Sequence, residues 1–92
     1  MRQSTIYKHS VAGGEAGYAH LLGAEIKRRR VQLGLSQGAL GEPLSRSFVS
    51  LVEHGRLTPS LPSLVMMATR LGTSAAGILT SVESQLEDRP GG

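Results

Sequence analysis

Apolar residues recur at helical spacing from about residue 20 onward. In the first such stretch, positions i, i+4, i+8 and i+11 fall on one face of an α-helix. These positions are occupied by Leu22, Ile26, Arg30 and Leu33. Gly34 follows directly and is suited to end the helix, because glycine tolerates the left-handed conformation of a C-cap. The pattern predicts an amphipathic helix that begins near His20 and buries this face.

Four more helices are predicted between residues 36 and 87, each preceded by a serine whose hydroxyl can cap the first turn. The capping residues are Ser36, Ser45, Ser60 and Ser74, and Pro43, Gly55 and Gly72 follow the first three helices. The residues expected to face the core are Val49, Val52, Leu61, Leu64, Ala68, Leu71, Ala75, Ile78, Leu79, Val82 and Leu86. No pair of strands is evident, so the predicted fold class is all-α, a compact five-helix domain.

The two ends of the chain lack this periodicity. Residues 1–19 contain three glycines and few regularly spaced apolar residues, so we interpret them as a flexible N-terminal arm. The alternative is an arm that becomes ordered on a partner or on a second copy of the chain. Residues 88–92 end in Pro-Gly-Gly and are predicted to be a disordered tail, which leaves 20–87 as the folded domain.

Composition narrows the class of protein. The 92 residues suffice for one domain, and only 3% of them are aromatic, so the core must be aliphatic. The absence of cysteine excludes disulfides and thiolate metal sites, and it fits a reducing compartment. The longest apolar run, Leu64–Ala68, is far shorter than the roughly 20 residues that span a bilayer, and no signal peptide is evident. We therefore expect a cytoplasmic protein with no membrane partner.

Charge is distributed unevenly along the chain. Ten lysine and arginine residues outnumber seven acidic ones, for a formal net charge of +3. Residues 1–70 hold nine of the basic and four of the acidic side chains, whereas residues 71–92 are net acidic. An anionic partner is therefore expected to contact the first seventy residues.

Residues that could carry catalysis or hold a metal are scattered. His9, His20 and His54 lie in different segments, without the spacing of metal ligands. The glycine-rich stretch 13–17 follows no strand and lacks the Lys-Ser/Thr pair of a phosphate-binding loop. We predict a protein that is not an enzyme and that uses no cofactor or metal.

The order of several short motifs is more informative about function. They are LGAEIKRRR from Leu22, GLSQ from Gly34, Leu40, SRSFVSLVEHG from Ser45, and Pro59-Ser60. Together they resemble the Cro/repressor-type helix-turn-helix family, often called XRE-like, from about Leu22 to Leu79. The resemblance implies a lambda-repressor-like fold, and the apolar stripe from Ile78 to Leu86 predicts a C-terminal helix extended past the usual end of that domain. The resemblance also implies that the helix after Ser45 is a recognition helix, which enters the major groove of DNA.

The resemblance assigns roles to residues around that helix. The outward positions expected to contact base edges are Arg46, Ser47, Ser50 and Leu51. The implied phosphate contacts are Ser36, Gln37, Ser45, His54 and Arg56. Arg46 can bridge two guanine acceptors, whereas Leu51 can contact only a thymine methyl or remain a bystander. For His54 and Arg56, an ordinary solvated loop is the alternative.

Other positions have structural roles by the same resemblance. The family pairs an arginine at the position of Arg30 with the glutamate that ends the recognition helix, which implies an ion pair between Arg30 and Glu53. A small residue is needed where the two helices of the motif cross, and Gly41 stands there. The neighbouring Lys27 and Arg28 are expected either in solvent or near phosphate.

The turn between the two motif helices departs from the family. Between Leu40 and Val49 the sequence is two residues shorter than usual, and Pro43-Leu44-Ser45 replaces the turn glycine. Two residues are about half a helical turn, so we expect a shortened first helix and a rebuilt turn. The recognition helix is then expected to sit at an unusual angle.

We predict a sequence-specific DNA-binding transcriptional regulator, most simply a repressor, located in the cytoplasm at the nucleoid. The expected partner is double-stranded DNA, with a palindromic operator bound by a homodimer. The predicted dimer interface lies on the C-terminal helix, at Ile78, Leu79, Val82 and Leu86, unless this helix folds back onto its own chain. The alternative function is a protein-interaction module on the same fold, such as an antitoxin-like or co-regulator subunit that binds a protein partner.

Overall fold

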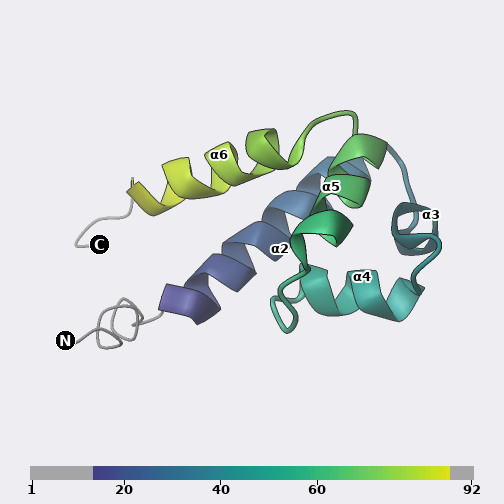
Figure 1. The fold of residues 1–92 in the computed structure, drawn as a ribbon, viewed down its shortest axis with the longest axis horizontal. Coiled ribbons are helices and arrows are strands. Elements are labelled where there is room, and N and C mark those ends of the chain that lie inside the picture. The colour runs from purple at the N-terminus through teal and green to yellow at the C-terminus, as the bar shows by residue number, and fades with distance from the viewer. Residues whose placement is uncertain (1–13, 88–92) are drawn as a thin grey trace.

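The computed structural model describes residues 14–87, in which five α-helices and no strand are found (Figure 1). The helices are α2 (Gly14–Gln32), α3 (Gln37–Gly41), α4 (Arg46–Glu53), α5 (Leu61–Arg70) and α6 (Ala75–Glu87). The predicted all-α class is therefore confirmed. None of these helices is long and apolar enough to cross a membrane.

Much of the molecule packs against α2, which is the longest helix. It contacts α6 along one side and α4 on another, while α3 packs on α4 and α5, and α5 also contacts α6 (Figure 1). The buried core is aliphatic, as the composition indicated, and Tyr18 and Phe48 pack against it only partly buried. Its members are Leu22, Ile26, Leu40, Val49, Val52, Leu64, Met67, Ala68, Leu71, Ile78 and Val82.

The last four helices begin at the serines expected from the sequence. In each case the serine Oγ accepts a hydrogen bond from the backbone N–H three residues later. The pairs are Ser36 with Ala39 (3.0 Å), Ser45 with Phe48 (3.1 Å), Ser60 with Ser63 (3.3 Å) and Ser74 with Gly77 (3.0 Å). Each such cap contributes about 1 kcal/mol of helix stability.

The first helix starts earlier than the apolar pattern predicted. α2 begins at Gly14 rather than near His20, so residues 14–19 of the expected arm are helical. That part of the prediction was wrong. The rest of the expected arm, 1–13, and the expected tail, 88–92, lie outside the described residues.

Packing against α6 explains this longer helix. Ala19 is buried and Tyr18 is half-buried against the core. Burial and, to a lesser extent, the nearby carboxylate of Glu83 on α6 raise the pKa of Tyr18. These contacts come from a helix some sixty residues later in the chain, so they leave no periodic signal within α2 itself.

Two leucines expected in the core are exposed instead. Leu33 lies beyond the end of α2, which stops at Gln32, and its side chain is 54% exposed. Leu61 is the first residue of α5 and is 63% exposed. Met67, on the same helix, is fully buried and fills the core there.

The C-terminal helix folds back onto its own chain. Ile78 and Val82 are fully buried in the core that α6 forms with α2 and α5. Assigning these two residues to a dimer interface was therefore wrong, because the chain itself covers them. Leu79 and Leu86 pack against the edge of the same core and remain partly exposed.

Two glycines allow α4 to be held closely by its neighbours. A Cβ atom at Gly41 would lie 2.7 Å from Cγ2 of Val49, which confirms the predicted need for a small residue where α3 and α4 cross. A Cβ atom at Gly23 of α2 would lie 2.2 Å from the carbonyl oxygen of Val52. The second contact, which the sequence pattern did not indicate, brings α2 against the C-terminal end of α4.

Candidate nucleic-acid interface

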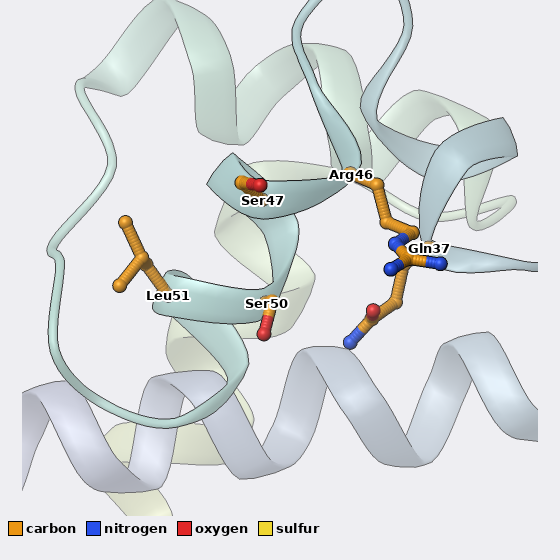
Figure 2. A pocket seen from close by; sticks show the side chains of 5 residues that line it. All are labelled: Gln37, Arg46, Ser47, Ser50 and Leu51. Carbon is orange, nitrogen blue, oxygen red and sulfur yellow. The ribbon is translucent and has the colours of Figure 1, made fainter.

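The helix α4 has one buried and one accessible face. Val49 and Val52 are at most 1% exposed and anchor the helix to the core. The accessible face carries Arg46, Ser47, Ser50 and Leu51 (Figure 2). This division follows from helical spacing, because the two valines lie three residues apart on the strongly apolar side.

The four accessible side chains line a hollow together with Gln37, the first residue of α3 (Figure 2). A second hollow shares Ser50 and Leu51 and continues to His54 and Arg56, beyond the end of α4. We call this continuous set the α4 surface: Gln37, Arg46, Ser47, Ser50, Leu51, His54 and Arg56. It brings together all the residues predicted to contact bases and three of those predicted to contact phosphates.

The other two expected phosphate contacts, Ser36 and Ser45, are N-caps outside these hollows. Both are exposed, and each Oγ accepts a backbone hydrogen bond. Accepting that bond leaves the hydroxyl proton available to a phosphate oxygen. A capping role and a phosphate contact are therefore compatible at both positions.

Gln37 has a contact that the sequence did not indicate. Its Nε2 donates a hydrogen bond of 3.0 Å to Oε1 of Glu53, at the far end of α4. One amide proton is thus used within the chain, and the second proton and the carbonyl oxygen remain for a ligand. This bond orients the Gln37 side chain over the α4 surface.

His54 is oriented by the helix it follows. Its Nδ1 lies 2.8 Å from the carbonyl oxygen of Ser50. Because a carbonyl oxygen can only accept, Nδ1 carries the proton in this contact. The other ring nitrogen, Nε2, is not used in this contact.

The ion pair implied between Arg30 and Glu53 is present. Nε of Arg30 lies 2.6 Å from Oε2 of Glu53, and Nη2 lies 3.0 Å from Oε1. The glutamate side chain is 1% exposed, and its hydrogen bonds raise the pKa of Arg30 despite the burial of both groups. Arg30 also donates to the carbonyl oxygen of Leu35. The pair joins α2 to the end of α4, so Arg30 is a structural residue.

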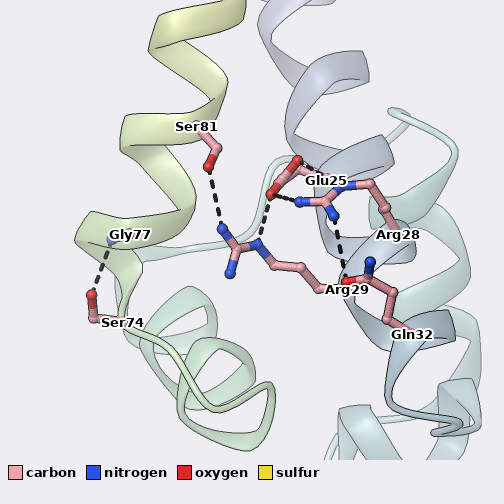
Figure 3. A network of polar contacts seen from close by, with 7 residues as sticks. All are labelled: Glu25, Arg28, Arg29, Gln32, Ser74, Gly77 and Ser81. Atoms are coloured by element: carbon pink, nitrogen blue, oxygen red, sulfur yellow. Dashed lines mark hydrogen bonds and ion pairs between the residues drawn. The ribbon is translucent and has the colours of Figure 1, made fainter.

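Two more arginines of the basic run are engaged by Glu25. Nη2 of Arg28 and Nε of Arg29 lie 2.6 and 2.7 Å from the buried carboxylate, and Arg29 also donates to Oγ of Ser81 on α6 (Figure 3). Burial of Glu25 opposes its ionisation, but the bonds from the two arginines outweigh it and lower the pKa of Glu25. Of the run 27–30, three arginines are therefore paired within the chain.

The basic run consequently contributes less to a binding surface than its charge indicated. Arg28 was expected in solvent or near phosphate and is 54% exposed while paired. The spacing of Glu25 to Arg28 and Arg29, three and four residues apart on one helix, was a signal that could have identified the pairing. The bridge from Arg29 to Ser81 had no comparable signal, because it joins residues 52 positions apart.

Comparison with known families decides the class of domain. The family of the helix-turn-helix domain matches residues 21–78, well over half of the chain. The protein belongs to this family. No curated protein and no solved structure gives a significant match to it.

The matched residues include both α3 and α4, so the accessible face of α4 lies within the helix-turn-helix domain. The first motif helix has only five residues, which agrees with the shortened spacing seen in the sequence. Among residues 14–87 no group of three histidine, aspartate or glutamate side chains is placed to hold a metal ion.

Proposed function

We propose that this helix-turn-helix protein is a sequence-specific transcriptional regulator, acting as a repressor, that places α4 in the major groove of its operator. The observation that supports this most is the α4 surface. It combines hydrogen-bonding groups from one helix face with a cationic residue near each end, Arg46 and Arg56. A groove about 12 Å wide admits such a helix, and its base edges match these donors and acceptors.

Each part of the surface has a role in this proposal. Arg46 and Ser47, at the N-terminal end of α4, contact base edges, and Ser50 and Leu51 contact the bases or methyl groups that follow. Gln37, His54 and Arg56 contact phosphates on either side, together with the capping hydroxyls of Ser36 and Ser45. Phosphate contacts fix the register, whereas base contacts determine the sequence that is recognised.

We further propose a homodimer on a palindromic operator. One α4 surface offers few contacts, and two half-sites about one helical turn apart multiply the binding energy. With Ile78 and Val82 buried inside the chain, Leu79 and Leu86 are the residues of α6 that remain for the interface.

Selection from a random pool of DNA, followed by titration of the selected sequence, tests the proposal. Arg46→Ala should lose about 1–3 kcal/mol of discrimination at one base pair. Lys27→Ala is the control, because it removes one positive charge from an exposed residue of α2 outside the α4 surface and outside the ion pair of Arg28 with Glu25.

The titrations are repeated at several salt concentrations, since phosphate contacts make the affinity fall steeply with salt. If no DNA is enriched or bound at low salt, the proposed function is wrong. If the wild type binds and Arg46→Ala binds equally well, the docking of α4 is wrong.

One observation favours the alternative, a protein-interaction module. Leu51 is 44% exposed at the junction of the two hollows, where it offers DNA no hydrogen bond. Leu51→Ser distinguishes the two functions. If the α4 surface binds DNA, Leu51→Ser should leave the DNA affinity within a few-fold of the wild type. If the surface binds a protein partner that buries Leu51, the variant should lose the binding of that partner.

A further inference from the structure

The turn between α3 and α4 is held by a residue from a distant helix. α3 has five residues, so the carbonyl oxygens at its C-terminal end have no following helical turn to donate to them. The backbone N–H of Leu44 donates to the carbonyl oxygen of Gly41. The carbonyl oxygens on either side, of Leu40 and Glu42, accept hydrogen bonds from a distant part of the chain.

Arg70 supplies those donors. It is the last residue of α5, and its Nη1 donates to the carbonyl oxygen of Leu40 at 3.1 Å and to that of Glu42. Arg70 lies 30 residues after Leu40 and 28 residues after Glu42 in the sequence. A guanidinium is suited to this position because it is always charged and carries several N–H donors in a rigid plane.

The contact between Arg70 and the turn lies next to the N-terminal end of α4, which is the end that contacts base edges in the proposed function. Glu42 is followed three residues later by Ser45, the N-cap of α4, and then by Arg46 and Ser47. Gly41 packs closely on Val49 in the middle of α4, and Gly23 packs closely on Val52 at its C-terminal end. The N-terminal end of α4 directly follows the turn that Arg70 contacts.

We propose that Arg70 is a positioning residue for DNA recognition, which fixes the shortened turn so that Arg46 and Ser47 meet the base edges in one orientation. Arg70 acts through the backbone of the turn and does not itself contact DNA. This inference rests on the proposed function of the α4 surface. It also explains how a motif that lacks the usual turn glycine keeps a defined recognition helix.

The test compares Arg70→Ala and Arg70→Lys with Arg56→Ala, on the selected operator and on operators with single base-pair changes. Arg70→Ala should weaken operator binding roughly tenfold and reduce base discrimination, with the salt dependence unchanged. Arg70→Lys should restore part of the loss, because an ammonium can donate to the same carbonyls. Arg56→Ala, which removes a phosphate contact, should weaken binding to all sequences and reduce the salt slope by about one.

Amide hydrogen exchange of the free protein gives a readout that needs no DNA. Arg70→Ala should speed exchange at Leu44, whose N–H is bonded within the turn, and leave exchange in α2 unchanged. Unchanged exchange at Leu44, unchanged discrimination, or a reduced salt slope in Arg70→Ala would each overturn the inference. Failure of the wild type to bind any DNA, with faster exchange at Leu44 in the variant, would overturn the proposed function and the role of Arg70 in DNA recognition, and would leave Arg70 as a residue that only stabilises the turn.

Discussion

Two buried carboxylates, those of Glu25 and Glu53, accept hydrogen bonds from the arginines of α2. Glu53 accepts bonds from Arg30 and Gln37, and Glu25 accepts bonds from Arg28 and Arg29. Removing Arg30 should cost about 3–5 kcal/mol, because the Glu53 carboxylate that remains is 1% exposed and poorly solvated. Most of the basic run on α2 therefore stabilises the fold, whereas Arg46 and Arg56 of the α4 surface form no ion pair within residues 14–87.

Glu25 should make stability depend on acid pH. Its pKa is lowered in the folded state from the ordinary value of 4.5, so it stabilises the fold above that value and the contribution is lost as the pH falls through the folded pKa. Glu25→Gln should reduce the free energy of unfolding at pH 7 by about 1–2 kcal/mol, and the difference should shrink as the pH falls below 4.5 and through the folded pKa.

Urea unfolding from pH 7 to pH 3 measures this difference. Glu87→Gln, which alters an exposed carboxylate at the end of α6, is the control and should change stability little at any pH. A Glu25→Gln variant whose deficit stays constant to pH 3 would contradict the assignment of the pH dependence to this carboxylate.

At the scale of helices, the orientation of α4 depends on close backbone approach. α2 meets the C-terminal end of α4 at Gly23, and α3 meets α4 at Gly41. Both contacts leave no room for a Cβ atom, and at Gly23 the opposing atom is a backbone carbonyl that cannot move aside. The serine caps determine where each helix begins, and these glycines determine how closely the helices pack.

Gly23→Ala should therefore destabilise the protein although alanine is the better helix former. The new methyl group would overlap the carbonyl oxygens of Val52 and Glu53, 2.2 and 2.8 Å away, at a cost of about 1–3 kcal/mol or more. Gly38→Ala in α3 is the matched control, because the nearest atom to its Cβ is 3.9 Å away. It should be neutral or stabilising by up to about 1 kcal/mol. Thermal unfolding of both variants measures the contrast, and equal melting temperatures would show that α2 and α4 are not closely packed.

For the whole molecule, the proposed homodimer depends on the part of α6 that the chain leaves exposed. α6 uses its most apolar face inside the chain, and only its edge leucines remain partly exposed. An interface built on them would be smaller than one built on the whole face, so a weak dimer that is reinforced on the operator is expected.

Leu86→Asp should convert this dimer to a folded monomer, since an unpaired carboxylate would face the apolar contact. Sedimentation velocity over a range of concentrations, with circular dichroism to confirm the fold, measures the effect. Ser84→Asp adds the same charge at an exposed position of α6 and should leave the dimer intact. A wild type that stays monomeric both free and on operator DNA, or a Leu86→Asp variant that still dimerises, would contradict the proposed interface.

Local interactions made much of this structure predictable from the sequence. A serine cap acts on an N–H three residues away and an apolar face repeats within one helix, so the helix starts at Ser36, Ser45, Ser60 and Ser74 were evident. The accessible face of α4 followed from the same spacing. The pairing of Arg30 with Glu53 came from the resemblance to a family.

Contacts between segments distant in sequence were decided only in three dimensions. The early start of α2, the burial of Ile78 and Val82, and the bonds from Arg70 to the turn all depend on which helix lies beside which. An apolar stripe such as that of α6 has the same sequence pattern whether its own chain or a second copy of the chain covers it. The local sequence around a surface arginine is likewise the same whether the side chain contacts a phosphate or a backbone carbonyl oxygen. Its sequence neighbours do not indicate which distant segment packs beside it.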